Sequence, residues 1–476
     1  MDIHAASRLA SGGEGLVVDS AGVGNFVNDS LLIGMSDLVE ARTQRPLVLT
    51  GGRGVFVIDE RGREYMEAVS AFSCAALGFN EPELVEAARR QMSRLPMAPT
   101  AYNRTAPVVL ELADRLAEVS PIPNARIAFT TTGSEANDNL VKFTWYGNVH
   151  AGEPARRRIV SRRGSYHGHT VLTYGMGGNP DAQRTYGIPM QDHLHVSQPS
   201  GPAQGEGTAE YVARLAEELR DTIERAGPET IAAFIAEPIS FSADVAIPPD
   251  DYFRAIKAVL DDYGIRLYAD EVLSGFGRTG EMWGCTSFDI SPDCVTSSKG
   301  LSSAYQPIGA IFMSPEFYER IEAASVANGW FSHAATYHAH PVAAAVALKV
   351  LDIWRERRLI EHVRAIVPVW RDAIEGLSDH PLVVSARSQG LMSGIELRTE
   401  RGADTRLLGG QPARGIAKAV YNAAFDEGLI VRPGTDMIKM TPPIIISEAE
   451  IHELVRRLRR ALDAVLHGRR HGGPQS

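Results

Sequence analysis

The sequence predicts an α/β fold in which helices cover both faces of a mainly parallel sheet. Short apolar runs of strand length alternate with amphipathic runs of helical period along most of the chain. Two of the apolar runs end in an acid, Glu237 and Asp270, at the strand end where open α/β sheets bind their ligands. The 476 residues suffice for one large α/β domain and a smaller one.

The composition argues against several classes of partner. A formal net charge of −10 disfavours nucleic acid or an anionic membrane surface, and the basic run 155–163 is expected to be solvated surface. The three cysteines form neither a disulfide framework nor a zinc pattern. No segment has the pattern of a signal peptide or a membrane span. We therefore expect a cytoplasmic protein.

The N-terminal part of the chain supplies packing elements. Residues 1–24 are small and weakly patterned, which predicts a flexible arm or a lid-like lead-in. Residues 54–65 read as a strand, a Glu-Arg-Gly turn and a second strand, and hence as a small hairpin. A helix begins at Glu81-Pro82 and is expected to extend to about Arg94, with one apolar face formed by Leu84, Val85, Ala88 and Met92.

A candidate phosphate site comes next. A strand over residues 125–130 turns through Gly133 and Ser134 into a helix over residues 135–145. Small residues at a helix N-terminus leave backbone N–H groups and the positive end of the helix dipole open to an anion, so Gly133 and Ser134 are candidates to bind a phosphate. The alternative is that Ser134 is an ordinary N-cap of a buried helix.

An aromatic residue and two histidines follow the strand at residues 158–160. Tyr166 lies in a Gly-Ser-Tyr-His-Gly-His turn and is a candidate to stack on a planar ring. His167 and His169 suggest a metal site only weakly, because no third ligand has matching spacing. Residues 171–205 are rich in Gly, Pro and Gln, which predicts a long loop near the crevice.

Asp270 and Lys299 form the central pair. Residues 265–269 read as a buried strand ending at Asp270, and Lys299 follows 29 residues later in a Ser-Ser-Lys-Gly turn. Pyridoxal phosphate chemistry needs such a pair, because the lysine forms a Schiff base with the aldehyde and the carboxylate keeps the pyridine nitrogen protonated. The alternative is a turn-capping aspartate and a solvated lysine. Glu237, after the strand at 230–236, is expected to position a switching arginine or the cofactor's edge; the alternative is a carboxylate that caps a turn.

The rest of the chain predicts a second, smaller α/β unit. A strand at 308–313 and a helix from 315 to 324 complete the first unit. Three histidines at 333, 338 and 340 resemble metal ligands at first sight, but a loop with a capped helix start fits them better. The expected elements of the second unit are helices over 359–377, 413–427 and 448–466, strands near Leu382, Met392 and Leu429, and a frayed tail at 467–476.

Seven motifs, taken together and in this order, connect these segments to one family. They are TTGSEAND at 131–138, YHGHT at 166–170, AEP at 236–238, ADEVLSGFGRTG at 269–280, SKGLSSAYQPIG at 298–309, ATYHAHPVAAA at 335–345 and GLIVRPGTDMIKMTPPIIIS at 428–447. With them the sequence resembles the class III pyridoxal-phosphate aminotransferases of fold type I, in particular the ω-transaminase branch, over nearly its whole length.

The resemblance implies a fold and a division into domains. It implies a large domain with a mainly parallel seven-stranded sheet flanked by helices, and a smaller α/β domain from the N- and C-terminal segments. The implied boundaries are 1–75 for the N-terminal arm and part of the small domain, 76–345 for the large cofactor-binding domain and 346–476 for the C-terminal small domain.

The resemblance also implies roles for single residues. Lys299 would be the Schiff-base lysine and proton shuttle, and Asp270 would bind the pyridine nitrogen. The other implied cofactor contacts are Gly133 and Ser134 at the phosphate, Tyr166 and Val272 on the two ring faces, and Thr336 reaching the phosphate from the partner subunit. A homodimer with shared active sites follows from the last of these roles, and a tetramer is the alternative.

Arg432 resembles the mobile arginine of this branch, which pairs with a substrate carboxylate and swings away for a neutral amine. A bidentate guanidinium suits that task. The alternative is a surface arginine beside a strand.

The chain departs from the family pattern in three places. Where the branch commonly reads GLWC, residues 71–74 read Ala-Phe-Ser-Cys, so that Ser73 replaces a large aromatic. This loss opens a pocket wall, and we expect Phe72 and Ser73 to line a roomier substrate site that takes long or bulky amines. The segment 28–37 lacks the usual His-Pro-Phe lead-in, and His338-Ala339 stands where Ser-Gly is commoner.

The implied activity is a ping-pong transfer of an amino group from a primary amine, long or bulky and not an α-amino acid, to an oxo acid such as pyruvate. An aminomutase, a racemase or a decarboxylase on the same scaffold is the alternative within the cofactor class. A non-catalytic pyridoxal-binding or regulatory protein is the alternative from another class, but such proteins usually lose the lysine or the acid, and this chain has both. No metal is expected.

Overall fold

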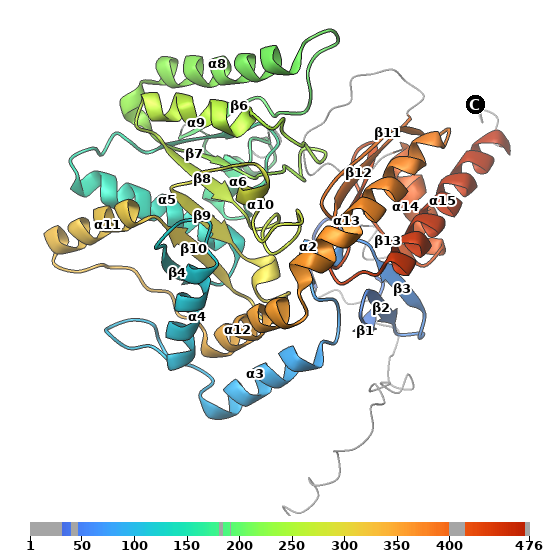
Figure 1. Cartoon of the computed structure of the whole chain (residues 1–476), viewed down its shortest axis with the longest axis horizontal. Helices are drawn as coiled ribbons and strands as arrows, with labels where there is room; N and C mark the ends of the chain where they lie inside the picture. The colour runs from blue at the N-terminus through green and yellow to red at the C-terminus, as the bar shows by residue number, and fades with distance from the viewer. Residues whose placement is uncertain (1–30, 40–45, 180–183, 191, 399–414, 472–476) are drawn as a thin grey trace, which may run out of the picture.

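The computed structural model describes residues 31–39, 46–179, 184–190, 192–398 and 415–471. The predicted N-terminal arm at 1–24 lies outside the described residues. Figure 1 shows a larger part built on one central sheet and a smaller part in which the first strands of the chain lie beside its last helices.

The central sheet has seven strands in the order β4-β10-β9-β8-β7-β5-β6. β5 to β9 pair in parallel, whereas β10 is antiparallel to both of its neighbours, β9 and β4. This confirms the mainly parallel seven-stranded sheet of a fold type I transferase. The strands are β4 (Arg126–Thr130), β5 (Arg158–Arg162), β6 (His193–Val196), β7 (Ile231–Ala236), β8 (Arg266–Asp270), β9 (Cys294–Ser297) and β10 (Gly309–Met313).

Helices cover both faces of this sheet, so its inner strands are apolar on both sides. All six residues of β7 are buried. Alternate side chains reach different cores: Ile235 and Tyr268 join one core cluster, and Phe234 and Leu267 join the other. The helices of this part are α3 (Pro82–Arg94), α4 (Pro107–Glu118), α5 (Gly133–His150), α6 (Val171–Met176), α8 (Thr208–Ala226), α9 (Tyr252–Asp262), α10 (Gly284–Ser287), α11 (Pro315–Asn328) and α12 (Pro341–Glu356).

Two four-stranded sheets build the smaller part. One has the order β1-β2-β3-β13, with β13 (Leu429–Ile430) parallel to β3 (Glu64–Glu67), so that the two ends of the chain share a sheet. The other has the order β11-β12-β15-β14. The remaining elements are β1 (Leu49–Arg53), β2 (Phe56–Asp59), α2 (Ser70–Ser73), α13 (Leu359–Glu375), β11 (Val383–Gln389), β12 (Met392–Leu397), α14 (Gly415–Asp426), β14 (Arg432–Pro433), β15 (Met437–Met440) and α15 (Glu448–His471).

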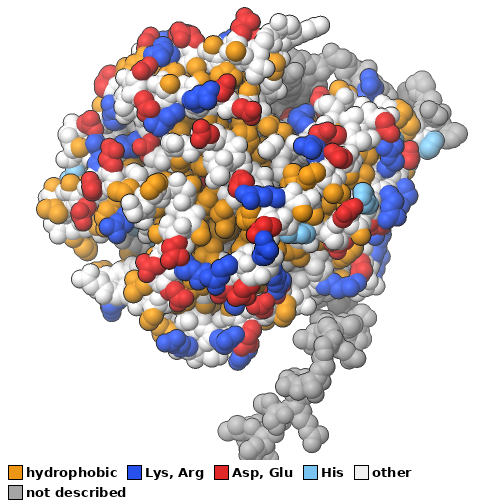
Figure 2. Space-filling view, in the orientation of Figure 1, with side chains coloured by type: hydrophobic (Ala, Val, Ile, Leu, Met, Phe, Trp, Pro, Cys, Tyr) orange, Lys and Arg blue, Asp and Glu red, His pale blue; other side chains and the backbone are white. Residues whose placement is uncertain are grey.

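The domain boundaries stay predictions, and the one at 345/346 falls inside the continuous helix α12. Within the described ranges, no helix is long and apolar enough to cross a membrane. Figure 2 shows acidic and basic side chains interspersed over the face it draws.

Several local predictions were wrong. Residues 171–205 are not one long loop, because a capping box between Thr170 and Thr173 starts α6 and the edge strand β6 pairs with β5. The tail does not fray at 467, because α15 continues to His471. In α3, Leu84 is buried and Ala88 packs on the core, but Val85 and Met92 are more than half exposed in the single chain.

The basic run 155–163 is also not uniformly solvated. Arg157 and Arg163 are exposed and pair with Asp192 and Glu218, as a solvated run would. Arg162, in contrast, is fully buried in β5, where its guanidinium donates to the backbone carbonyl of Glu237. Its guanidinium carbon also lies 6.0 Å from the ring centre of Tyr252.

Candidate active site

Asp270 is the last residue of β8 and is almost completely buried at the carboxyl edge of the sheet. Its Oδ2 lies 2.8 Å from the side-chain nitrogen of Asn137 and 2.8 Å from Nδ1 of His167. Its Oδ1 accepts a hydrogen bond of 3.1 Å from the backbone N–H of Val272. Because a carboxylate can only accept, Nδ1 of His167 carries the proton in this pair. Donors from three directions therefore fix the orientation of the Asp270 carboxylate.

Lys299 follows β9, the strand next to β8, and starts a short 3-10 turn with φ 27°. Pairing of Asp270 with Thr296 across these strands places the two residues at the same sheet edge. Burial lowers the pKa of the Lys299 amine, Asp270 opposes this shift, and Arg432 adds to it. Within the described chain, the Lys299 side chain makes no hydrogen bond or ion pair. A neutral, unbonded amine is the form that acts as a nucleophile or a base.

Gly133 and Ser134 begin α5. Thr132 is the N-cap, its hydroxyl accepting from the N–H of Glu135 at 3.1 Å, so the alternative of a Ser134 N-cap is wrong. Ser134 lies in the first turn, where its hydroxyl accepts a 3.1 Å hydrogen bond from the N–H of His169. A Cβ at Gly133 would lie 2.7 Å from both γ-methyls of Val272. This cradle of small residues at a helix N-terminus fits a phosphate group.

Val272 and Tyr166 both lie near Asp270. Val272 is fixed by its backbone hydrogen bond to Asp270 and by its close approach to Gly133. Burial raises the pKa of the Tyr166 hydroxyl to about 12; nearby Arg432 opposes that shift, and Asp270 adds to it. Tyr166 is therefore neutral, and its ring packs edge-on against His169 at 5.4 Å.

Glu237 follows β7 and is buried. Its Oε2 accepts a 2.6 Å hydrogen bond from Ser240 and lies 4.0 Å from the guanidinium of Arg162. Burial raises the pKa of the Glu237 carboxyl, and His167 and Arg162 oppose this shift. The arginine that Glu237 contacts is thus Arg162, and not Arg432.

Arg432 is a half-buried residue of β14, so the alternative of an ordinary surface arginine does not hold. Its guanidinium carbon lies 5.8 Å from the ring centre of Phe241. Burial lowers the pKa of Arg432 and Tyr166 raises it. No acidic side chain of the described residues forms an ion pair with Arg432. It is available to a carboxylate that comes from outside the chain.

Three further predicted residues have their contacts outside this cluster. Thr336 is exposed on the loop before α12, in a turn that the N–H of His338 closes on the carbonyl of Ala335 at 3.2 Å. Phe72 is 68% exposed. Ser73 is buried, with its hydroxyl 2.7 Å from that of Thr441.

Comparison with known proteins identifies the family. The family model described as "Aminotransferase class-III" matches residues 39–462. The chain belongs to the class III aminotransferases. Enzymes of this family use pyridoxal phosphate, and the residues described above have the chemistry to hold it.

Named relatives are similar over most of their length. A probable mitochondrial gamma-aminobutyrate transaminase 3 of Oryza sativa subsp. indica is 37% identical over 97% of this chain and 91% of its own. A chloroplastic gamma aminobutyrate transaminase 3 of Solanum lycopersicum is 39% identical over 88% of this chain and 80% of its own.

Solved structures are similar as well. The omega transaminase of Pseudomonas jessenii in complex with PMP has a TM-score of 0.88 at 37% identity, covering 93% of this chain and 98% of its own. The PMP-bound aminotransferase of Vibrio fluvialis has a TM-score of 0.87 at 35% identity, covering 92% and 97%. A thermostable omega transaminase variant, with one tryptophan changed to glycine and engineered for asymmetric synthesis of enantiopure bulky amines, has a TM-score of 0.88 at 37% identity, covering 92% and 98%.

Sequence reasoning missed the residues that hold Asp270 in this aminotransferase. The amide nitrogen of Asn137 bridges Asp270 and the carbonyl of His167, both at 2.8 Å, while its amide oxygen accepts from Thr296 at 2.7 Å. A signal was present, because Asn137 lies four residues after Gly133 and so on the same face of α5. The sequence suggests His167 only as a weak candidate for a metal ligand, whereas in the structure its Nδ1 lies 2.8 Å from the carboxylate of Asp270.

The histidines before α12 have structural partners. Nε2 of His338 lies 2.7 Å from the carboxylate of Glu135, and His340 caps α12 by accepting from the N–H of Val342. Among the residues that the structure describes, no group of three or more His, Cys, Asp or Glu side chains could hold a metal ion.

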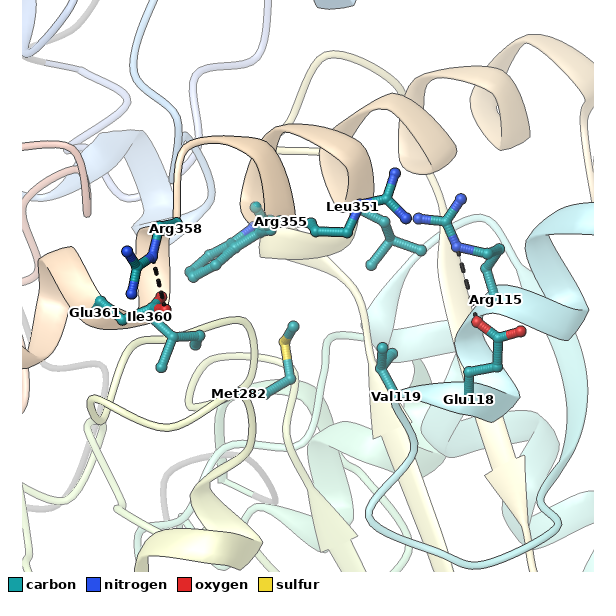
Figure 3. Close-up of a pocket in the computed structure, with 10 residues that line it drawn as sticks. Arg115, Glu118, Val119, Met282, Leu351, Arg355, Arg358, Ile360 and Glu361 are labelled. Atoms are coloured by element: carbon teal, nitrogen blue, oxygen red, sulfur yellow. Dashed lines mark hydrogen bonds and ion pairs between the residues drawn. The ribbon is translucent and has the colours of Figure 1, made fainter.

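A cavity of about 360 Å³ lies elsewhere, between α4, α12 and the start of α13 (Figure 3). Its arginines are already paired, Arg115 with Asp352 at 3.2 Å and Arg358 with Glu361 at 3.1 Å. None of the predicted site residues lines it. The cavity is therefore separate from the aminotransferase site.

Proposed function

We propose that this aminotransferase moves an amino group from a primary amine that is not an α-amino acid to an oxo acid such as pyruvate, in two half-reactions. The observation that carries the proposal is Arg432, a half-buried guanidinium that has no ion pair among the described residues and acts electrostatically on both Tyr166 and Lys299. An oxo acid brings the carboxylate that this guanidinium lacks, whereas a simple amine does not need it.

Pyridoxal phosphate supplies the aldehyde that takes up the amino group and the cationic ring that withdraws electrons from it. Gly133 and Ser134 would hold its phosphate, Asp270 its ring nitrogen, and Tyr166, Val272 and Glu237 its ring. Lys299, whose amine pKa is lowered by burial, would take the proton from the carbon that bears the amino group and return it later in the transfer. The three hydrogen bonds to Asp270 hold its carboxylate still throughout.

The names of relatives support a donor with its amine far from any carboxylate. Gamma-aminobutyrate, which the plant relatives are named for, is such a donor, and its distant carboxylate would suit Arg432. Ser73, small where the branch carries a large aromatic, supports long or bulky donors. The engineered variant for bulky amines supports the same idea, since it too replaced a tryptophan by a small residue.

We further propose a homodimer with shared active sites, in which the exposed Thr336 reaches the phosphate bound by the partner subunit. Subunits carrying Lys299→Ala and subunits carrying Thr336→Ala would then complement each other, because a mixed dimer keeps one site with both residues intact. Recovery of activity and of cofactor affinity on mixing is expected. A monomer by light scattering, or no recovery, would contradict the shared site. A cytoplasmic location stays a proposal.

The half-reaction tests the proposed function. Purified enzyme loaded with pyridoxal phosphate is expected to lose its visible absorption band when a primary amine is added alone, and to regain it with pyruvate. An aminomutase, racemase or decarboxylase would not need the second substrate. Borohydride reduction followed by peptide mapping should label Lys299; labelling of another lysine would refute the assignment. A Ser73→Trp variant should lose bulky amines first, and unchanged activity on them would refute the roomier pocket.

A further inference from the structure

The segment Ser70–Ser73, between β3 and α3, has a strained backbone. Ser70, Ala71 and Ser73 have φ values of 49°, 57° and 60°, and Ala71 combines its value with ψ −120°, a conformation that favours glycine. None of the three is glycine. Such conformations persist only where the surrounding structure holds them, and they gather at functional sites.

Glu67, the last residue of β3, holds this segment from one side. It is buried, and its two carboxylate oxygens each accept one backbone hydrogen bond, Oε1 from the N–H of Val69 at 3.0 Å and Oε2 from the N–H of Ala71. A carboxylate is the one side-chain group of this size that offers two acceptor oxygens and no donor. Glutamine could satisfy only one of the two N–H groups.

Thr441, just after β15, holds the segment from the other side. Its backbone carbonyl accepts from the hydroxyl of Ser70 at 2.6 Å, and its hydroxyl lies 2.7 Å from that of Ser73. Its hydroxyl also donates to the carbonyl of Val69 at 3.2 Å, and its N–H donates to the carbonyl of Ala68 at 2.8 Å. Glu67 and Thr441 together form what we call the loop clasp.

The clasped segment lies next to the reactive lysine. Cys74 directly follows it, and the N–H of Leu77 donates to the hydroxyl of Ser303, four residues after Lys299, at 2.8 Å. The side chain of Phe72 is exposed between the hydrogen-bonded Ser70 and Ser73. A shift of the segment would therefore move Phe72 and Ser73 relative to Lys299.

We propose that Glu67 is a positioning residue that sets substrate specificity: through the loop clasp it holds Phe72 and Ser73 where the side group of the amine donor binds. This inference rests on the proposed function. Glu67 touches neither substrate nor cofactor in this scheme; it acts through the backbone of Val69 and Ala71. Thr441 supports the same geometry from the second sheet of the smaller part.

The first test measures how firmly the segment Ser70–Ser73 is held, and it does not depend on catalysis. Holoenzyme is alkylated with iodoacetamide, and the rate at Cys74 is followed by mass spectrometry, with the buried Cys285 and Cys294 as internal references. Glu67→Gln and Thr441→Val are each expected to raise the Cys74 rate about tenfold, because the first loses one backbone hydrogen bond and the second loses the hydroxyl contacts with Ser73 and Val69. The reference cysteines should keep their rates.

Asp59 provides the matched control. It is a buried carboxylate in the same sheet, and its Oδ1 likewise accepts two backbone hydrogen bonds, from Arg61 and Arg63, both at 2.9 Å. Asp59→Asn likewise replaces a carboxylate that accepts two backbone hydrogen bonds, away from the clasped segment. It should lower the Tm but leave the Cys74 rate unchanged.

The second test measures specificity for the amine donor. Glu67→Gln should raise the KM of a bulky primary amine about tenfold, leave the KM of pyruvate and the kcat with a small amine within about threefold, and keep the visible cofactor band. Asp59→Asn should change none of these. The inference is overturned if neither Glu67→Gln nor Thr441→Val changes the alkylation rate of Cys74. It is also overturned if neither variant changes the ratio of kcat/KM for a bulky amine to kcat/KM for a small amine. Failure of the proposed function would show separately, as a wild-type enzyme that converts no primary amine.

Discussion

Two buried carboxylates at strand ends, Asp270 in the larger part and Glu67 in the smaller part, are held in opposite ways. Asp270 receives its side-chain hydrogen bonds from Asn137 and His167, which lie 133 and 103 residues away in sequence. Glu67 receives its hydrogen bonds from the backbone two and four residues further along. The first carboxylate is positioned by the fold, whereas the second positions its own chain.

The difference explains what each acid contributes to the site. Three fixed donors leave Asp270 as an oriented charge at the sheet edge, ready for a cationic ring. Both hydrogen bonds of Glu67 come from the backbone of the segment that follows it, so this carboxylate fixes the local backbone. Substitutions that keep the size of each acid but remove its charge should therefore fail in different ways.

Asp270→Asn should have the largest effect. An asparagine cannot carry the negative charge, and its amide nitrogen would face the donors of Asn137 or His167. We expect kcat/KM to fall about a thousandfold, as when one preorganised electrostatic group is lost from an active site, with little change in Tm. A fall of less than tenfold, measured with the cofactor band intact, would contradict the pairing of Asp270 with the ring nitrogen.

Ionisation of Glu67 should instead change the stability of the folded protein. Burial raises the pKa of its carboxyl from 4.5 to about 7, although its two backbone donors oppose the shift. A raised pKa means that its contribution to stability is complete below about pH 4.5 and is lost as the pH rises through about 7. The difference amounts to roughly 3 kcal/mol at 1.36 kcal/mol for each pKa unit.

Calorimetry of the holoenzyme between pH 5 and 8 checks this. The Tm of the wild type should fall relative to that of Glu67→Gln as the pH rises, because glutamine does not ionise. Above pH 7 the ionised carboxylate accepts both N–H groups, so the loop clasp is complete at some expense in stability. Parallel Tm profiles of the two proteins would contradict a buried, titrating Glu67.

Asn137→Ala should have an intermediate effect on the Asp270 side of the comparison. It removes one donor to a charged group, which is worth about 1.5–3 kcal/mol and hence roughly a 10- to 100-fold loss of kcat/KM. Asn148 is the matched control, since it is buried on the same helix and donates to the carbonyl of Arg156 at 2.6 Å, away from the site. Equal losses of activity in the two variants would mean that α5 is merely destabilised.

The same comparison shows which parts of the molecule the sequence could predict. The central sheet and the pair Asp270 and Lys299 were predictable, because strand-length apolar runs are local in sequence and acids at their ends follow a general rule of α/β sheets. The edge strand β6 and the short helix α6 were not. Each is short, and β6 has a single neighbouring strand, so neither carries a strong periodic pattern.

The hydrogen-bond partners of Asp270 and Glu67 were harder to predict from the sequence. The bond between His167 and Asp270 spans 103 residues, and only the fold brings them together. Glu67 is close to its partners in sequence, but its role depends on positive φ values at Ser70, Ala71 and Ser73. The residue types of this segment do not predict positive φ values, because none of the three residues is glycine. Fully buried Arg162 was mistaken for solvated surface, because composition alone does not show that its guanidinium reaches the carbonyl of Glu237.

The smallest expected effect is at Gly133, and it tests how tightly the Asp270 site is packed. In Gly133→Ala the new methyl would lie 2.7 Å from both γ-methyls of Val272, whose N–H binds Asp270. Val272 must shift, and overpacking of about 1 kcal/mol should weaken pyridoxal phosphate binding about fivefold in an equilibrium titration.

A second substitution should repair the first. Val272→Ala removes both γ-methyls, so the double variant Gly133→Ala/Val272→Ala should bind the cofactor more tightly than the product of the two single effects predicts. Gly147→Ala, on the same helix, is the control, because its methyl would meet only the flexible side chain of Arg320 at 3.2 Å. Strictly additive effects would mean that Gly133 acts through the helix N-terminus alone, and not by letting Val272 approach.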